Sequence, residues 1–184
     1  MRELALHILD LVENCIVAKA SNVWLEVHEN FSADRLTIII KDNGRGMSRE
    51  TVEKVRDPFV TTRTTRRVGL GIPLMEMNAI RAGGYLDIES EVGEGTRLTA
   101  VFQHSHLDRP PLGNMVSTVK VLLVINPELE FSYRHTFDDR SFMITTRELR
   151  EILGEIPLTQ PEVLEWLDQY LRDGIANLYG GANF

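Results

Sequence analysis

Cysteine is nearly absent from this sequence. The chain of 184 residues contains one cysteine, Cys15, and a single cysteine cannot form an internal disulfide. Cys15 belongs to an apolar stripe of helical spacing that also includes Ile8 and Leu11. We therefore expect a buried thiol that carries no chemistry.

Long apolar runs are also missing. No run approaches the roughly 18 residues that a membrane-spanning helix needs, and the composition, 43% hydrophobic and 26% charged, is typical of a soluble globular protein. The first residues, MRELALHILDLVENC, carry acidic side chains in a helical pattern and lack the apolar core and cleavage site of a signal peptide. These features predict a cytoplasmic protein without a membrane partner.

Positive charge is in deficit. The chain has 20 Lys and Arg residues against 27 Asp and Glu residues, which gives a net charge of -7. A general nucleic-acid binder needs strong attraction to the phosphate backbone, although a local basic patch can coexist with an acidic whole. The charge balance therefore argues against nucleic acid as a partner and favours a protein.

The first part of the chain has the pattern of an α/β fold. Helical spacing of apolar residues, β-branched runs and turn residues predict helices and strands in a definite order. The predicted elements are a helix over 4–20, strands over 22–30 and 35–41, a short helix capped by Ser48 and ended by Asp57-Pro58, a helix over 69–82, and strands over 85–91 and 96–104. Helices grouped against a mostly antiparallel sheet predict a two-layer α/β sandwich rather than a doubly wound parallel sheet.

The second part of the chain has no recognisable motif or internal repeat. We expect a domain over 1–106, a linker over 107–113 and a small α+β extension over 114–184. The extension contains an apolar run over 115–125, a predicted hairpin over 129–145 and predicted helices over 147–153 and 162–178. His104 and His106 are interpreted as polar residues at a strand end rather than metal ligands. By exclusion, we expect the extension to be a partner-binding or dimerising element.

The strongest local signal is DNGRG, which directly follows a predicted buried strand. Asp42 at the strand end can accept a hydrogen bond from an exocyclic amine, and Gly44 and Gly46 let backbone pass close to a ligand. Upstream, Asp10 and Asn14 share one face of the first helix, and an amide oxygen is a suitable ligand for Mg²⁺. Each motif has an ordinary alternative, because DNGRG is also a good surface turn and the helix residues also suit a solvated face.

Two further glycine motifs follow in the chain. Gly69-Leu70-Gly71 opens a helix whose free N–H groups and positive end suit phosphate. The turn over 93–96 ends in Thr96, whose hydroxyl can reach the adenine end of a ligand, although a hairpin turn needs no function. The order of all these motifs, from the helix with Asp10 and Asn14 to the turn with Thr96, is the order required by one known nucleotide site.

On these motifs, residues 1–104 resemble the GHKL ATPases, the Bergerat-fold superfamily of gyrases, MutL proteins, heat-shock chaperones and histidine kinases. The segment LDLVENCIVAKAS is most similar to MutL, whereas DPFVTTRTTRRVGLGIPLM and SEVGEGTRLTAVF look most like histidine kinases. The resemblance implies ATP and Mg²⁺ as ligands and a Bergerat-type sandwich as the fold.

The resemblance also implies roles for individual residues. Asn14 would bind Mg²⁺, and Asp42 would bind the adenine amino group with Gly46 and Thr96 nearby. The remaining candidates for nucleotide contact are Gly44, Met47, Thr62, Arg63, Gly69, Leu70 and Gly71, with Arg66 and Arg67 as further candidates in a mobile lid.

Two departures from the family pattern affect the predicted activity. Hydrolytic members have Glu at the position of Asp10, and the shorter side chain predicts slow hydrolysis if Asp10 is the general base. A histidine kinase carries its phosphoacceptor histidine on a helical hairpin before the ATP-binding domain, whereas here the first predicted helix starts at residue 2 or 3. We therefore do not expect a self-sufficient histidine kinase.

Three functions stay open at this point. The preferred one is an ATP-dependent phosphotransferase or regulatory module that acts on a separate protein. The second is a MutL- or chaperone-like switch, in which Asp10 activates water and hydrolysis reopens a complex. The third is a nucleotide sensor that binds ATP without turnover.

Overall fold

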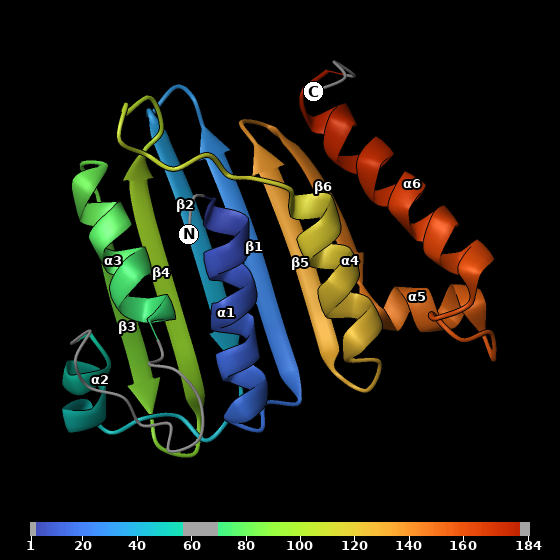
Figure 1. Ribbon diagram of the computed structural model, residues 1–184, viewed down its shortest axis with the longest axis horizontal. Coiled ribbons are helices and arrows are strands. Elements are labelled where there is room, and N and C mark those ends of the chain that lie inside the picture. The colour runs from blue at the N-terminus through green and yellow to red at the C-terminus, as the bar shows by residue number, and fades with distance from the viewer. Residues whose placement is uncertain (1–2, 57–69, 181–184) are drawn as a thin grey trace.

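The computed structural model describes residues 3–56 and 70–180 (Figure 1). Its helices are α1 (Leu4–Val17), α2 (Arg49–Val55), α3 (Gly71–Arg81), α4 (Met115–Ile125), α5 (Thr146–Leu153) and α6 (Pro161–Leu178). Its strands are β1 (Asn22–Asn30), β2 (Arg35–Asp42), β3 (Tyr85–Glu91), β4 (Gly95–Gln103), β5 (Glu130–Phe137) and β6 (Arg140–Thr145). Within the described ranges, no helix is long and apolar enough to cross a bilayer.

The strands form a single mixed sheet. Their order across the sheet is β3-β4-β2-β1-β5-β6. The pairing of β1 with β5 is parallel, and the other four pairings are antiparallel. Helices α1, α3 and α4 lie side by side over one face (Figure 1). The predicted two-layer α/β sandwich with a mostly antiparallel sheet is confirmed.

The core lies between this helical layer and the sheet. Alternate residues of β1 and β2 point toward the helices, and each of them is at most 2% exposed: Val23, Leu25, Val27, Leu36, Ile38 and Ile40. Leu4, Ile8 and Val12 of α1 cover them with no exposed surface. Burying such a side chain contributes about 1.5–3 kcal/mol. Apolar residues recur at every second position in the strands and at every fourth position in α1. This spacing therefore determines which face of the sheet packs against which face of the helix.

The first helix is shorter than the sequence predicts. It ends at Val17 rather than Ala20, because Lys19 adopts a left-handed conformation with φ +61. The short helix α2 starts as predicted, with the Ser48 side chain accepting a hydrogen bond from the Thr51 N–H at 3.3 Å. The early end of α1 turns the chain back into β1 and places Ala18 against the loop that follows β2.

The C-terminal part of the chain extends the same sheet. Strand β5 pairs with β1 from Asn22 opposite Glu130 to Glu29 opposite Phe137. The apolar run over 115–125 forms α4, and α6 packs against α4 and β6. Helix α6 approaches β6 closely at Gly174, which faces the Phe142 ring. One sheet therefore runs through both parts of the chain. The division into a domain, a linker and an extension stays a prediction.

A buried carboxylate joins segments that are far apart in the sequence. Glu29 of β1 is 7% exposed. Its Oε2 lies 2.9 Å from Nε2 of His104, its Oε1 lies 2.9 Å from Nε2 of His135, and the Tyr179 hydroxyl donates to Oε1. Burial alone would raise the pKa of Glu29, but the hydrogen bonds from His135, Tyr179 and His104 outweigh it and lower the pKa to about 2. We call these four residues the Glu29 cluster.

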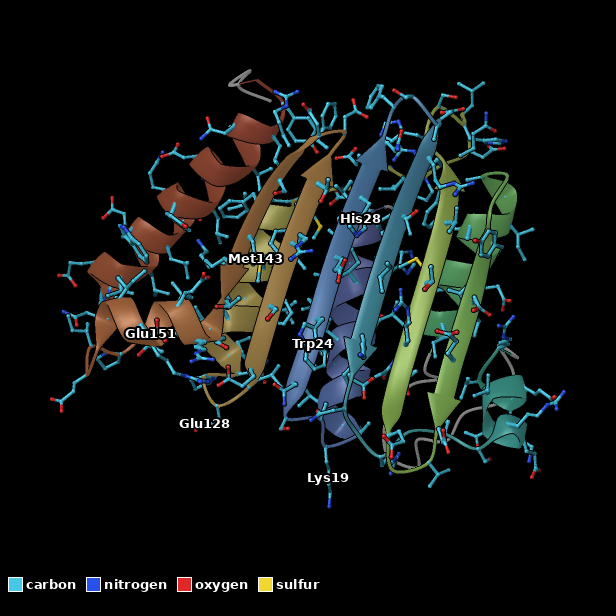
Figure 2. All side chains as sticks on the ribbon, turned by 180° about the vertical axis from the view of Figure 1, so that it is seen from behind. Lys19, Trp24, His28, Glu128, Met143 and Glu151 are labelled. Carbon is cyan, nitrogen blue, oxygen red and sulfur yellow. The ribbon has the colours of Figure 1, made fainter. Side chains whose placement is uncertain are left out.

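Figure 2 shows the face of the sheet that the helices do not cover. Trp24, His28 and Met143 lie on this face. The ammonium group of Lys41 lies 5.4 Å from the centre of the Trp24 ring, a cation–π contact. The six described helices leave this face open (Figure 2), and Asp42 lies at the end of β2 rather than on this face.

Candidate functional site

The site begins with a buried carboxylate at the end of β2. Asp42 is the last residue of that strand and is 5% exposed. Its Oδ1 accepts the N–H of Gly44 at 2.7 Å, which fixes the side chain beneath the following loop. Burial, together with the neighbouring Asp42 carboxylate, raises the pKa of the Cys15 thiol. Cys15 is therefore buried and protonated beside Asp42, and the predicted burial of this thiol is confirmed.

Two glycines let the loop after β2 meet the turn between β3 and β4. Gly46 has φ +62, and a Cβ at this position would lie 1.8 Å from the carbonyl oxygen of Glu91. Gly95 has φ +115, and a Cβ there would lie 2.0 Å from the carbonyl oxygen of Asp42. Side chains are therefore incompatible with both positions. The sequence motifs DNGRG and GEGT are therefore in direct contact in the folded chain. We call the surface that they form, from Asp42 to Met47 and from Ser90 to Thr96, the wall.

Thr96 and Ser90 complete this wall. Thr96 lies opposite Asp42 in the pairing of β2 with β4, and Ser90 lies opposite Thr96 in the pairing of β3 with β4. The Ser90 hydroxyl accepts the N–H of Met47 at 2.8 Å and lies 2.9 Å from the Thr96 hydroxyl. Met47 is thus held at the wall by its backbone, with its side chain packed against the core.

Asp10 and Asn14 face the start of α3. A Cβ on Gly71 would lie 3.4 Å from Cβ of Asp10 and 3.8 Å from Nδ2 of Asn14. Asp10 is exposed and Asn14 is half-buried. Leu70 precedes the first turn of α3, and no side chain of the described residues caps that turn. The polar face of α1 therefore meets a positive helix end, where N–H groups favour an anion.

The end of α1 connects these two groups of residues. The N–H of Arg45 donates to the carbonyl oxygen of Ala18 at 2.9 Å. A Cβ on Gly44 would lie 2.8 Å from that same oxygen. The loop after β2 therefore rests on the last turn of the helix that carries Asn14, and Asp42 and Asn14 belong to one region of the fold.

A hollow of about 590 Å³ lies at this end of the sheet. Asp42, Ser90 and Thr96 line it from the strands, and Arg49 and Val52 line it from α2. Its volume is in the range of small-molecule sites. A second hollow, about 510 Å³, lies between α4 and α6 and contains none of the predicted residues.

The predicted site residues divide into three groups. The structure brings Asp42, Gly44, Gly46, Met47 and Thr96 together in one wall, and it places Asp10 and Asn14 beside Leu70 and Gly71. Thr62, Arg63, Arg66, Arg67 and Gly69 lie outside the described residues. Sequence reasoning missed Ser90, although it is the one polar residue after Leu86 and Ile88 in the inward positions of β3.

The mixed sheet and the helices on its face have the arrangement predicted for a Bergerat-type ATPase fold, and comparison with known proteins assigns the family. The family model described as "Histidine kinase-, DNA gyrase B-, and HSP90-like ATPase" matches residues 2–106. The chain belongs to this family, and the resemblance to the GHKL ATPases is confirmed.

Relatives of known sequence extend the comparison. The sensor protein kinase FleS of Pseudomonas aeruginosa is 38% identical over 94 residues, which is 51% of this chain and 23% of FleS. The phosphotransferase RcsD of Escherichia coli is 28% identical over 172 residues, which is 85% of this chain and 17% of RcsD. The chain therefore spans less than a quarter of the length of either relative.

Solved structures share the fold. The MutL ATPase domain of Aquifex aeolicus, complexed with ADP, superimposes with a TM-score of 0.50 at 20% sequence identity, covering 85% of this chain and 69% of that domain. The N-terminal domain of a DNA repair protein gives a TM-score of 0.53 at 14% identity, covering 78% of this chain and 52% of the other. Both likenesses concern the backbone arrangement.

Proposed function

We propose that the chain binds ATP with Mg²⁺ and acts on a separate protein, as a phosphotransferase or a regulatory module. The observation that carries the proposal is the position of Asp42, a buried carboxylate beside Thr96 in the hollow at the end of the sheet. Its oxygens accept hydrogen bonds only, and an adenine amino group donates them. The ATPase family of the chain and its kinase relatives support this assignment.

The phosphates would lie toward α1 and α3. The start of α3 at Gly71 offers N–H groups and a positive helix end beside the polar face of α1. Mg²⁺ usually takes one or two protein oxygens and completes its shell with phosphate and water. The side chains of Asn14 and Asp10 fit that requirement, and the ion would neutralise charge on the phosphates.

The proposed reaction is transfer of the terminal phosphoryl group. An acceptor atom of the partner protein forms a bond to the γ-phosphorus, the bond from that phosphorus to the bridging oxygen breaks, and ADP leaves. The proton of the acceptor passes to a base on the partner. This chemistry depends mainly on positioning and charge neutralisation, so the chain itself needs to supply little more than the binding site.

A second function has one specific observation in its favour. Asp10 is exposed and lies against Gly71, where the phosphates are expected. This position supports a role for Asp10 as the base that activates water in a hydrolytic switch. The MutL-like backbone is compatible with this alternative. A sensor that only binds ATP is the limiting case, in which neither transfer nor hydrolysis occurs.

Incubation with γ-labelled ATP tests the proposal. The chain is mixed with proteins encoded by neighbouring genes, and label is followed in protein and in free phosphate. The expected result is label on one partner, with slow release of phosphate from the chain alone. Release of phosphate without any labelled protein would establish the switch, and tight ATP binding with neither product would establish the sensor. Absence of ATP binding would overturn the proposal as a whole.

A further inference from the structure

Three polar side chains form a row across strands β2, β4 and β3. Asp42 of β2 lies opposite Thr96 of β4, and Thr96 lies opposite Ser90 of β3. All three line the hollow at the end of the sheet. Neighbouring residues of the row are thus close enough to determine one another's hydrogen bonding.

Ser90 is the most constrained member of this row. Its oxygen accepts the N–H of Met47 at 2.8 Å, and its hydroxyl donates to the carbonyl oxygen of Gly95 at 2.9 Å. A hydroxyl has only one hydrogen. The contact of 2.9 Å between the Ser90 and Thr96 oxygens therefore requires Thr96 to donate and Ser90 to accept.

This direction determines what Thr96 offers to a ligand. Since the Thr96 hydrogen points to Ser90, the Thr96 oxygen presents lone pairs to the hollow. The Asp42 carboxylate also presents only acceptors, and its Oδ1 already accepts the N–H of Gly44. The base end of the hollow thus has two neighbouring acceptors, which suit an amino group and disfavour a carbonyl oxygen.

We propose that Ser90 is a positioning residue that sets nucleobase specificity, by holding the Thr96 hydroxyl in the direction that selects a 6-aminopurine over a 6-oxopurine. This inference rests on the proposed nucleotide site. Ser90 also connects the loop after β2 to the start of β4 through its hydrogen bonds with Met47 and Gly95. The same hydroxyl therefore stabilises the wall and determines the direction of the Thr96 hydrogen bond.

The test compares ADP with IDP, which differ at position 6 of the purine, where IDP has a carbonyl oxygen. Dissociation constants are measured by calorimetry for the unmodified chain, for Ser90→Ala and for Ser132→Ala. Ser132 is a half-buried strand serine, and no side-chain hydrogen bond to it occurs within the described part of the chain. It controls for loss of a strand hydroxyl as such.

The unmodified chain and Ser132→Ala are expected to prefer ADP. In Ser90→Ala the Thr96 hydrogen is released and can turn toward the ligand to donate to a carbonyl oxygen. The preference for ADP over IDP should then fall by about tenfold, the scale of one hydrogen bond in an affinity. Ser90→Thr keeps the hydroxyl and should keep the preference.

A second variant separates positioning from folding. Thr96→Val removes the hydroxyl that Ser90 orients, so its effect on the preference should not add to that of Ser90→Ala in the double variant. A purely structural role of Ser90 would lower the unfolding temperature and weaken both nucleotides alike, with the ratio unchanged. That unchanged ratio would overturn the inference.

Two other outcomes separate a failure of the proposed nucleotide site from a failure of the role of Ser90. If the unmodified chain binds neither nucleotide, the proposed nucleotide site itself fails. If it binds ADP and IDP equally, or if Ser90→Ala keeps the full preference, the nucleotide site stands and the role of Ser90 is rejected.

Discussion

At the scale of single residues, hydrogen-bond direction decides the chemistry of the candidate site. The Oδ1 atom of Asp42 accepts the N–H of Gly44, so a ligand can donate to the other carboxylate oxygen. The same hydrogen bond makes substitutions at this position informative, because the loop retains its partner while the group that faces the ligand changes.

Asp42→Asn should weaken ADP binding by tenfold or more. The amide oxygen of the new side chain would accept from Gly44, and its NH₂ group would face the amino group of adenine, leaving two donors without an acceptor. Calorimetry measures the effect. Asp87→Asn, at an exposed position of β3, is the matched control and should bind like the unmodified chain. Equal affinities for all three would remove Asp42 from the site.

Asp10→Asn distinguishes transfer from hydrolysis. If Asp10 activates water, this substitution should lower phosphate release by about 10²- to 10⁴-fold with ATP binding nearly intact. If the partner supplies the acceptor and its base, labelling of the partner should persist. Asp10→Glu places the carboxylate farther from the backbone and should raise phosphate release if reach limits it. No change in phosphate release in either variant would reject the hydrolytic role of Asp10.

At the scale of elements, the wall depends on backbone contact between two connections. Gly46→Ala should both destabilise the fold and abolish nucleotide binding, because the new Cβ would lie 1.8 Å from the carbonyl oxygen of Glu91. Gly93→Ala is the control, since Gly93 also has a positive φ of +88 but no described atom lies within 4 Å of its added Cβ. That substitution should cost only backbone strain, about 1–2 kcal/mol. Similar unfolding temperatures for the two variants would contradict the contact.

The sequence predicts local elements better than their long-range pairing. Strands β1 and β2 are predicted because the alternating apolar residues around Leu25 and Ile38 indicate one buried face. Helices α1 and α3 are predicted for the same reason, from apolar residues at helical spacing. The run over 115–125 is mostly apolar, and its spacing does not distinguish helix from strand. The structure shows that it forms α4. The parallel pairing of β1 with β5 has no local sequence signal, because it is set by packing of distant segments.

The same limit applies to the candidate site. Asp42 and Gly46 are predicted as site residues because they belong to the DNGRG motif and match the pattern of the family. Ser90 is missed because its contacts with Met47 and Thr96 depend on the register of three strands. A polar residue in an inward position of an alternating strand is the one signal that points to it.

At the scale of the whole molecule, the Glu29 cluster predicts a specific dependence on pH. The pKa of Glu29 falls from an ordinary value of 4.5 to about 2 in the folded chain. A lowered carboxyl pKa stabilises the fold above the ordinary value, and this contribution is lost as pH falls from about 4.5 toward 2. Since the group is buried, the contribution is about 3 kcal/mol near neutral pH.

Urea unfolding of the unmodified chain and of Glu29→Gln at pH 7, 5 and 3 measures this contribution. The difference in free energy of unfolding should be largest at pH 7 and 5 and should shrink at pH 3. Glu26→Gln is the control on the same strand, because Glu26 lies on the open face and pairs with the half-exposed His28. A difference for Glu29→Gln that is independent of pH would show that the carboxylate charge is unimportant there.

The parallel pairing of β1 with β5 has a consequence for how the chain is made. In the finished sheet β1 is an inner strand, with β2 on one side and β5 on the other. A ribosome adds about 5–20 residues per second, so β1 and β2 emerge seconds before Glu130–Phe137 can pair with Asn22–Glu29. Throughout that interval one side of β1 is an unpaired edge, which is a template for pairing with other chains. The nascent protein is therefore most vulnerable to aggregation after β1 and β2 have been synthesised and before β5 pairs with the open edge of β1.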